Sequence, residues 1–560
     1  MNYELRFISS LEKVFPKGGL LPAEKITDIT GFLGQRVSFQ AAYCFHGEYY
    51  VDQTLIQATR VPYVSVETET DFEGDIQIRK VECVPVNFPC YQDHDFAYLD
   101  DKAGLYPDLL VPTGKGLHVG IEQWRALWID CFIPKNMEGG ERRIELIFTL
   151  EDGKKVAGAA LTLHIVPVAL PTQKLIHTEW FYADCLADYY QCEVFSEKHW
   201  GLIEAFMKTA VSNGINMIFT PLFTPALDTL IGGERTTTQL IQIKKKEGEY
   251  CFDFSLLHQW LNLAKKVGYE YFEMSHLFSQ WGAKYPPKVV VNTGDKEEKL
   301  FGWHTPVEQS GYSAFLESFL PKLVEELKKS GVDKKTFFHI SDEPTTYNAD
   351  TYQKAYDMVI PYIQGFPIID ALSHLELYQK GIVKKPVPSN DHIHAFLEAG
   401  LKDGWTYYCC GQPNSVSNRF MAMPLWRTRI VGAQLYKYQM EGFLHWGYNF
   451  YNSQYSVHRI DPFRVNDAED AFPAGDAFLV YPGEGGRPLE SIRLLAMADA
   501  MADIQAYQLL ESLTNRDFVE NIIEEGKCRL RFDDFPTEAD YLIKVWEKVA
   551  EEIGKRLVRK

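Results

Sequence analysis

Phe337-Phe338-His339-Ile340-Ser341-Asp342-Glu343-Pro344 is the stretch of sequence that most constrains the fold. An apolar, strand-like run ends here in two adjacent carboxylates and a proline. Apolar runs of this length between helical segments are typical of buried parallel strands. Neighbouring side chains on a regular strand point to opposite faces, so the two acids converge on one pocket only where the strand breaks. Pro344 favours a break because it disfavours helical geometry at Glu343.

The same residue types also form ordinary helix caps and turns, and this alternative stays open for the string taken alone. Its surroundings favour a functional site. From about residue 172, strand and helix patterns alternate eight times, with strands at 175–181, 215–219, 269–275, 336–340, 367–369, 391–396, 405–409 and 442–446. Intervening helices are predicted at 196–214, 255–267, 312–329, 348–363, 420–440 and 491–512.

Eight strand–helix units predict a (β/α)8 TIM barrel over residues 172–515, with a loop subdomain after the second strand. Residues 1–171 show many short alternating strands and predict a β-sandwich. Residues 516–560 form a C-terminal helical extension, whose helix at 538–557 is expected to pack on the barrel exterior. Because barrel active sites lie at the carboxyl ends of the strands, the Asp342-Glu343 pair falls where a catalytic site is expected.

Composition narrows the class of protein. The 560 residues carry a formal net charge of −19, which argues against nucleic acid as a partner. The N-terminus has no apolar signal core and no segment is apolar enough to cross a membrane, so we expect a cytoplasmic protein without a membrane partner. The ten cysteines form no Cys-x-x-Cys pair and are expected to be reduced thiols. No metal or other cofactor is predicted, and the oligomeric state does not follow from the sequence.

A barrel hydrolase with two catalytic carboxylates needs a second acid at a separate strand end. The seventh strand, Gly404-Trp405-Thr406-Tyr407-Tyr408-Cys409-Cys410, has none. A 2-acetamido group on the sugar would replace the missing nucleophile, because its carbonyl oxygen can attack the anomeric carbon. Adjacent acids then suffice, with Glu343 as the protonated acid and Asp342 as the anion that stabilises the cyclic intermediate.

Aromatic and polar side chains at the other strand ends are expected to bind the sugar. We expect the Tyr407 hydroxyl to donate to the acetamido oxygen, and Trp405 and Trp446 to stack on the ring. For Trp405 and Tyr407, a place in the barrel core is the open alternative. The full predicted binding set is Trp180, His276, Trp405, Tyr407, Trp446, Tyr448 and Asn449.

The chain resembles glycoside hydrolase family 123 and its relatives with the same catalytic-domain type. The resemblance rests on the order and spacing of Ser341-Asp342-Glu343-Pro344, Trp405-Thr406-Tyr407, Gly442-Phe443-Leu444-His445-Trp446, Gly475-Asp476-Ala477-Phe478-Leu479-Val480-Tyr481-Pro482-Gly483 and Ser491-Ile492-Arg493. It implies an exo-acting β-N-acetylgalactosaminidase that retains configuration by substrate-assisted catalysis, with Asp342 orienting the acetamido group and Glu343 as acid/base. Ala422, where many relatives have an acid, and the eighth-strand pattern after His445 depart from the family and bear on the choice of sugar.

Three functions compete. The leading one is a retaining exo-glycoside hydrolase that removes terminal β-linked N-acetylhexosamine, with GalNAc as the expected sugar. The second is a glycosidase for a sugar without the acetamido group, such as a β-galactoside, with Asp370 or Glu376 as its nucleophile. The third is a non-catalytic carbohydrate-binding protein. A glycan or glycoside is the partner in all three.

Overall fold

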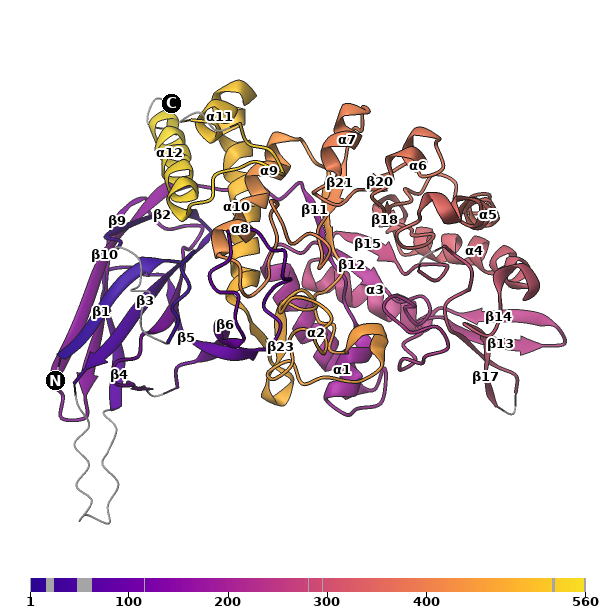
Figure 1. Cartoon of the computed structure of the whole chain (residues 1–560), viewed down its shortest axis with the longest axis horizontal. Coiled ribbons are helices and arrows are strands. Elements are labelled where there is room, and N and C mark those ends of the chain that lie inside the picture. The colour runs from indigo at the N-terminus through magenta and orange to yellow at the C-terminus, as the bar shows by residue number, and fades with distance from the viewer. Residues whose placement is uncertain are drawn as a thin grey trace, which may run out of the picture.

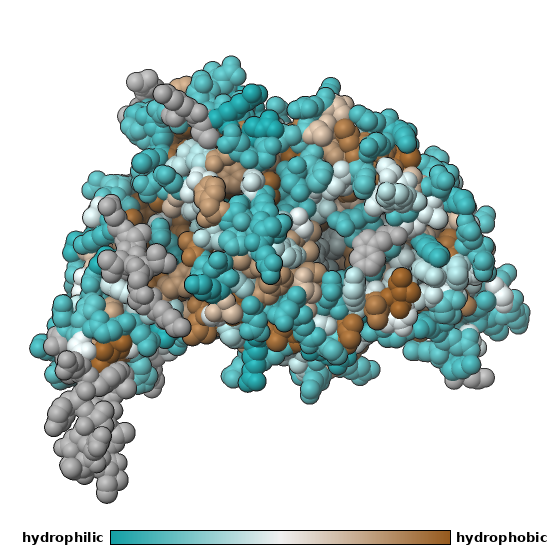
Figure 2. Space-filling model, viewed as in Figure 1, coloured by the Kyte–Doolittle hydropathy of each residue, from teal (hydrophilic) through white to brown (hydrophobic). Residues whose placement is uncertain are grey.

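The computed structural model describes residues 2–16, 25–47, 63–114, 116–280, 282–294, 296–525 and 529–557. A sheet-rich N-terminal region lies at one end of the molecule, and a mixed α/β region occupies the other (Figure 1). The last helices lie beside the N-terminal sheets. On the face shown in Figure 2, hydrophilic residues predominate and hydrophobic ones form small separate patches. Within the described ranges, no helix is both long and apolar enough to span a membrane.

Two five-stranded sheets build the N-terminal region. One has the order β1 (Asn2–Ser9), β3 (Arg36–His46), β8 (Arg125–Phe132), β5 (Asp75–Val86) and β6 (Gly104–Pro112). The other has the order β2 (Asp28–Leu33), β10 (Lys155–Ala169), β9 (Gly140–Leu150), β4 (Tyr63–Thr70) and β7 (Leu117–His118). Alternate residues such as Phe39, Ile129 and Phe148 are buried in one shared hydrophobic core, as the period-two pattern predicts.

A six-stranded parallel sheet organises the α/β region. Its order is β18 (Thr336–Phe337), β15 (Tyr271–Met274), β12 (Met217–Thr220), β11 (Ile176–Glu179), β22 (Gly442–His445) and β21 (Trp405–Tyr407). A separate parallel pair, β19 (Asp370–Ala371) and β20 (Pro386–Val387), follows in the chain. Single parallel bridges link Phe338 to Ile368 and Ser389 to Tyr407. The continuous sheet therefore has strands at six of the eight predicted positions, and the β19–β20 pair is linked to it through the single bridges.

Helices alternate with these strands. They are α1 (Ala183–Tyr189), α2 (Glu197–Ser212), α3 (Ser255–Val267), α4 (Tyr312–Lys329), α5 (Ala349–Val359), α6 (Leu375–Gln379), α7 (Ile393–Glu398), α8 (Leu425–Arg429), α9 (Val431–Lys437) and α10 (Ile492–Leu513). The Ser196 side chain caps α2 by accepting from His199 N, and Gly268 ends α3 with φ of 111°, a conformation that glycine adopts without strain.

The sixth predicted strand was misplaced. Residues 391–396 fall largely within helix α7, and the strand is the earlier β20. Ile393 and Phe396 lie three residues apart and are both buried, which is the spacing of a helix face. The loop subdomain is formed by two loops and not, as predicted, by the loop after the second strand alone. Strands β13 (Gln242–Lys246) and β14 (Glu249–Asp253) follow β12, whereas β16 (Val289–Asn292) and β17 (Glu297–Phe301) follow β15 and join the same four-stranded sheet.

The C-terminal helices α11 (Arg516–Ile523) and α12 (Ala539–Leu557) join the two regions. One hydrophobic cluster contains apolar residues of α10 and α12 together with Ile8, Phe32 and Trp128 of the N-terminal sheets. Trp546 Nε1 donates to the Thr30 carbonyl at 3.0 Å. The tail helix therefore packs on the sandwich as well as on α10, and not only on the barrel exterior as the sequence predicts.

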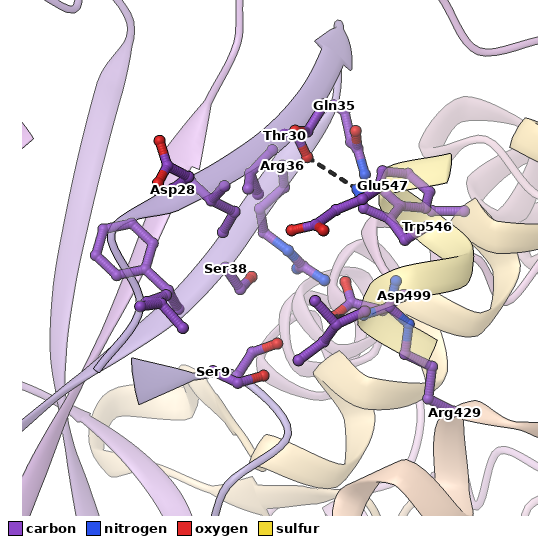
Figure 3. A pocket seen from close by; sticks show the side chains of 17 residues that line it. Ser9, Asp28, Thr30, Gln35, Arg36, Ser38, Arg429, Asp499, Trp546 and Glu547 are labelled. Atoms are coloured by element: carbon purple, nitrogen blue, oxygen red, sulfur yellow. Dashed lines mark hydrogen bonds and ion pairs between the residues drawn. The ribbon is translucent and has the colours of Figure 1, made fainter. Parts of the chain in front are cut away.

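A cavity lies at this junction, between α12, α10 and the strands β2 and β3 (Figure 3). Its charged groups belong to the packing of the junction. Arg429 forms a bidentate bond to Asp503 at 2.8 and 2.7 Å, and Arg36 donates to Asn213 at 2.8 Å. None of its lining residues comes from the parallel strands of the α/β region.

Candidate active site

An open cavity lies at the carboxyl ends of the parallel strands. It encloses about 630 Å³, counting the open space at its mouth. The strands β11, β21 and β22, the turn after β18 and the loops after β12 and β15 all contribute to its wall. The Asp342-Glu343 pair lines it together with Trp180, Tyr407 and Trp446.

A break in the backbone turns both acids toward this cavity. Glu343 has φ of 44°, in the left-handed region that a non-glycine residue adopts at a local cost. The Tyr407 hydroxyl donates to Glu343 Oε1 at 2.6 Å. Burial, and next the adjacent Glu343 carboxylate, raise the pKa of Asp342 well above its usual range. The acids are therefore a closely coupled pair, and in the empty cavity Asp342 resists ionisation.

A charged histidine lies beneath the pair. His339 Nδ1 is 3.2 Å from Asp370 Oδ1, and His339 Nε2 bonds to Glu273. Burial alone would lower the pKa of His339, but its hydrogen bonds to these two carboxylates raise it to about 9. The imidazolium is therefore positive at neutral pH, and its charge opposes the rise in the pKa of Asp342.

Ligand atoms of His276, His339 and Asp370 all lie within 4.8 Å of one another, which raises the question of a metal. The two imidazole rings stack with centroids 4.2 Å apart and planes inclined by 18°. Stacked rings direct their nitrogen lone pairs side by side and not at a common ion, and both His339 nitrogens already have carboxylate partners. This geometry does not fit a metal site.

Two tryptophans form walls of the cavity. Trp180 Nε1 donates to Glu273 Oε1 at 2.8 Å, and Trp446 Nε1 donates to Asp476 Oδ2 at 2.9 Å. Their polar atoms are thus bound to buried carboxylates, which leaves the apolar rings as the surface offered to a ligand. Such rings suit the apolar faces of sugars.

A second buried network supports Trp446. Arg419 donates to both Glu179 oxygens, at 2.8 and 2.7 Å, and its Nη2 lies 2.7 Å from His445 Nδ1. Burial, and next the Arg419 charge, lower the pKa of His445 well below its usual range, so this imidazole is neutral. Burial raises the pKa of Asp476 to about 7, although Arg419 and the Trp446 hydrogen bond oppose the rise.

Four residues of the predicted binding set do not line this cavity. Trp405 is fully buried and donates to Glu441 Oε2 at 2.7 Å, because it lies two residues, or about 7 Å, before Tyr407 along the strand. The Tyr448 hydroxyl donates to the Phe206 carbonyl at 2.9 Å.

The other two also have structural surroundings. Asn449 bonds to both backbone groups of Tyr182, at 2.8 and 3.0 Å, and so joins the loop after β22 to that after β11. His276 lies behind Trp180, with ring centroids 5.1 Å apart, and is only 3% exposed. Tyr407 does line the cavity, but its hydroxyl donates to Glu343 and not toward an open space.

The structure adds residues that the sequence analysis missed. Asp228 and Gln280 come from the loops after β12 and β15, and Cys409 and Cys410 follow β21. The two cysteines could have been inferred from their place at the end of a predicted strand. Asp228 and Gln280 stand in long loops without a motif, so no sequence signal marks them.

Comparison with known proteins decides the family. The family described as "Glycoside hydrolase 123, catalytic domain" matches residues 180–510. This chain belongs to glycoside hydrolase family 123. A solved structure of a family 123 glycoside hydrolase from Clostridium perfringens, analysed for its hydrolysis of glycolipid glycans, has the same fold, with a TM-score of 0.71, 16% identity, and coverage of 99% of this chain and 98% of the other. Among curated proteins, none matches.

More distant structures resemble this family 123 chain only weakly. They include a Rhizomucor miehei family 5 mannosidase, with a TM-score of 0.31, 10% identity and coverage of 64% of this chain and 95% of the other. A Parabacteroides merdae β-glucuronidase gives a TM-score of 0.29, 9% identity and coverage of 80% and 48%. The family membership makes the protein a glycoside hydrolase, and its acid pair in the strand-end cavity is the candidate reaction centre.

Proposed function

We propose that this hydrolase removes terminal β-linked N-acetylhexosamine, with GalNAc as the sugar, and that it retains configuration through the substrate's own acetamido group. The adjacent acids in one cavity are the observation that carries the proposal. The relative from Clostridium perfringens, studied for glycolipid glycan hydrolysis, supports a glycan substrate.

In the proposed reaction Glu343 donates its proton to the glycosidic oxygen as that bond breaks. The acetamido oxygen attacks the anomeric carbon and forms a cyclic oxazolinium ion. Asp342 accepts the amide N–H and stabilises the positive charge. Water, deprotonated by Glu343, then opens the ring and yields the sugar with its original configuration.

The raised pKa of Asp342 bears on this assignment. A neutral Asp342 in the empty cavity cannot stabilise a cation. The amide N–H that the bound substrate donates to Asp342 favours its ionised form, so substrate binding would leave the proton of the pair on Glu343. The His339 imidazolium beneath the pair also favours an anionic Asp342.

A glycosidase that uses a separate carboxylate nucleophile is the second candidate. Asp370 does not suit this role, because Tyr352, His339 and the Ile340 amide occupy its oxygens. Asp228 is the remaining carboxylate among the described residues that line the cavity. A β-galactoside-specific enzyme would therefore have to use Asp228.

A panel of aryl β-glycosides, with product configuration read by NMR, tests the proposal. We expect hydrolysis of aryl β-GalNAc with retention and little turnover of the matching galactoside. Glu343→Gln should lower kcat at least 1,000-fold and Asp342→Asn at least 100-fold. Full activity in either variant, or equal turnover of the galactoside, would refute the assignment.

We also infer that the eight parallel segments form a (β/α)8 barrel closed through the single bridges at Ile368 and Ser389. The domain division proposed with it is a sandwich at 1–171, the barrel at 172–515 and the helical extension at 516–560.

A further inference from the structure

Two hydrogen-bond acceptors without a donor lie together in the cavity wall. Gln280 Nε2 donates to the Thr229 carbonyl at 3.1 Å, which brings the Gln280 amide next to Asp228. This bond also assigns the amide orientation, because only the NH2 group can donate to a carbonyl. Gln280 is 5% exposed, and its Oε1 has no partner within the described residues. A buried amide oxygen in this state costs free energy unless a ligand or water satisfies it.

Asp228 presents a carboxylate oxygen in the same way. Its Oδ2 accepts from the Tyr455 amide at 3.0 Å, and its backbone carbonyl accepts from the Ser456 hydroxyl at 2.7 Å. For Oδ1, the described part of the chain supplies no hydrogen bond. These contacts hold the loop after β12 against the loop after β22 and leave one oxygen available at the cavity wall.

Donors are scarce on the same wall. The Trp180 and Trp446 N–H groups point to buried carboxylates, and the Tyr407 hydroxyl donates to Glu343. The described lining includes no Lys, Arg or His. Apart from weakly donating thiols and the one proton held by the acid pair, the wall therefore offers acceptors to a ligand that brings its own donors.

We propose that Asp228 and Gln280 form a hydroxyl-binding subsite that selects an uncharged sugar with free hydroxyls and rejects sugars bearing sulfate, phosphate or carboxylate at that position. The inference rests on the proposed function and names its substrate class. Sugar hydroxyls supply the donors that the two acceptors lack. An anionic substituent would instead meet a carboxylate, with no cation on the described wall to offset the repulsion.

Asp228→Asn is a conservative test. Asp228 has φ of 47°, a conformation that asparagine tolerates well, and the amide oxygen can still accept from Tyr455. Glu234→Gln is the matched control, because Glu234 is on the same loop but pairs with Lys288 and Lys299 and does not line this cavity. Both variants should unfold within 2 °C of the wild type.

The substrates are aryl β-GalNAc, its 3-, 4- and 6-deoxy forms and its 3-, 4- and 6-sulfated forms. For the wild type we expect kcat/KM to fall at least 100-fold with one deoxy form and at least 1,000-fold with the sulfated form at that position. Asp228→Asn should lower kcat/KM for the parent 10- to 100-fold. In this variant, kcat/KM for the deoxy form should be at most threefold lower than for the parent substrate. Such coupling between the residue and the hydroxyl is expected of a direct contact. Glu234→Gln should stay within twofold of the wild type.

Three results would overturn the subsite. The first is a kcat/KM of Asp228→Asn for the parent substrate within twofold of the wild-type value. The second is a loss of kcat/KM with the deoxy form that is as large in the variant as in the wild type. A loss above 10,000-fold would instead identify Asp228 as a nucleophile. If the wild type cleaves no aryl β-GalNAc, the proposed function fails, and calorimetric binding of free GalNAc then tests the subsite by itself. We expect Asp228→Asn to bind GalNAc at least tenfold more weakly than the wild type, and the wild type to bind no sulfated GalNAc. Equal affinities of the two proteins for GalNAc, or of the wild type for the two sugars, would refute the inference.

Discussion

Replacement of His339 by glutamine tests the charge network beneath the acid pair. The imidazolium is fully buried between Glu273 and Asp370, and its pKa is raised from 6.5 to about 9 by the hydrogen bonds to these carboxylates. A group whose pKa is higher in the folded state binds its proton more tightly there. Its stabilising contribution is therefore complete below pH 6.5 and is lost as the pH rises through 9.

The magnitude follows from the two pKa values. With 6.5 in the unfolded chain and about 9 in the folded one, linkage gives roughly 2 to 3 kcal/mol of stability at pH 7 and almost none at pH 10. We therefore expect the free energy of unfolding of the wild type to fall by roughly 2 to 3 kcal/mol more than that of His339→Gln between pH 7 and pH 10.

Urea unfolding of both proteins at pH 7 and pH 10 measures this difference, and groups that titrate in both proteins cancel. His199→Gln is the control. His199 is also buried, but burial lowers its pKa, so it stays uncharged from pH 7 to pH 10 and its replacement should not change the pH dependence. If His339→Gln loses as much stability as the wild type over this range, the imidazolium does not hold its proton as we describe.

Two further predictions separate the cavity wall from the core. Trp446→Ala should raise KM for the aryl substrate at least tenfold, because it removes a wall of the cavity. Trp405→Phe should leave kcat/KM within twofold of the wild type. It should lower the free energy of unfolding in urea by about 1 kcal/mol, because the hydrogen bond to Glu441 is lost. Arg419→Met should lower the free energy of unfolding by about 3 to 5 kcal/mol, since it leaves Glu179 buried without its partner. Equal effects of the two tryptophan variants, or an unchanged urea midpoint for Arg419→Met, would contradict these assignments.

Local patterns were enough to predict most elements. The helices at 255–267 and 312–329 have the predicted bounds, because their apolar residues recur at helical spacing and Gly268 and Gly331 follow them. The sixth strand was misplaced because β20 is only two residues long, begins with Pro386 and is followed by Pro388, so it has no periodicity of its own.

The position of the acid pair at a strand end could be predicted from the sequence, because its two members are neighbours in the chain and follow a strand. The binding residues were predicted less well, since a position on a strand does not tell how deep a side chain lies. Trp405 and Tyr407 share a face, yet one is in the packed core and the other at the cavity.

The sequence by itself therefore determined the alternation of strands and helices and the position of Asp342 and Glu343 at a strand end. Only the tertiary structure decided which other groups meet them. Tyr407 reaches Glu343 across 64 residues of chain, and Gln280 joins the Asp228 loop across 51. Periodicity records which face of an element is buried, but contacts between loops depend on how whole elements pack.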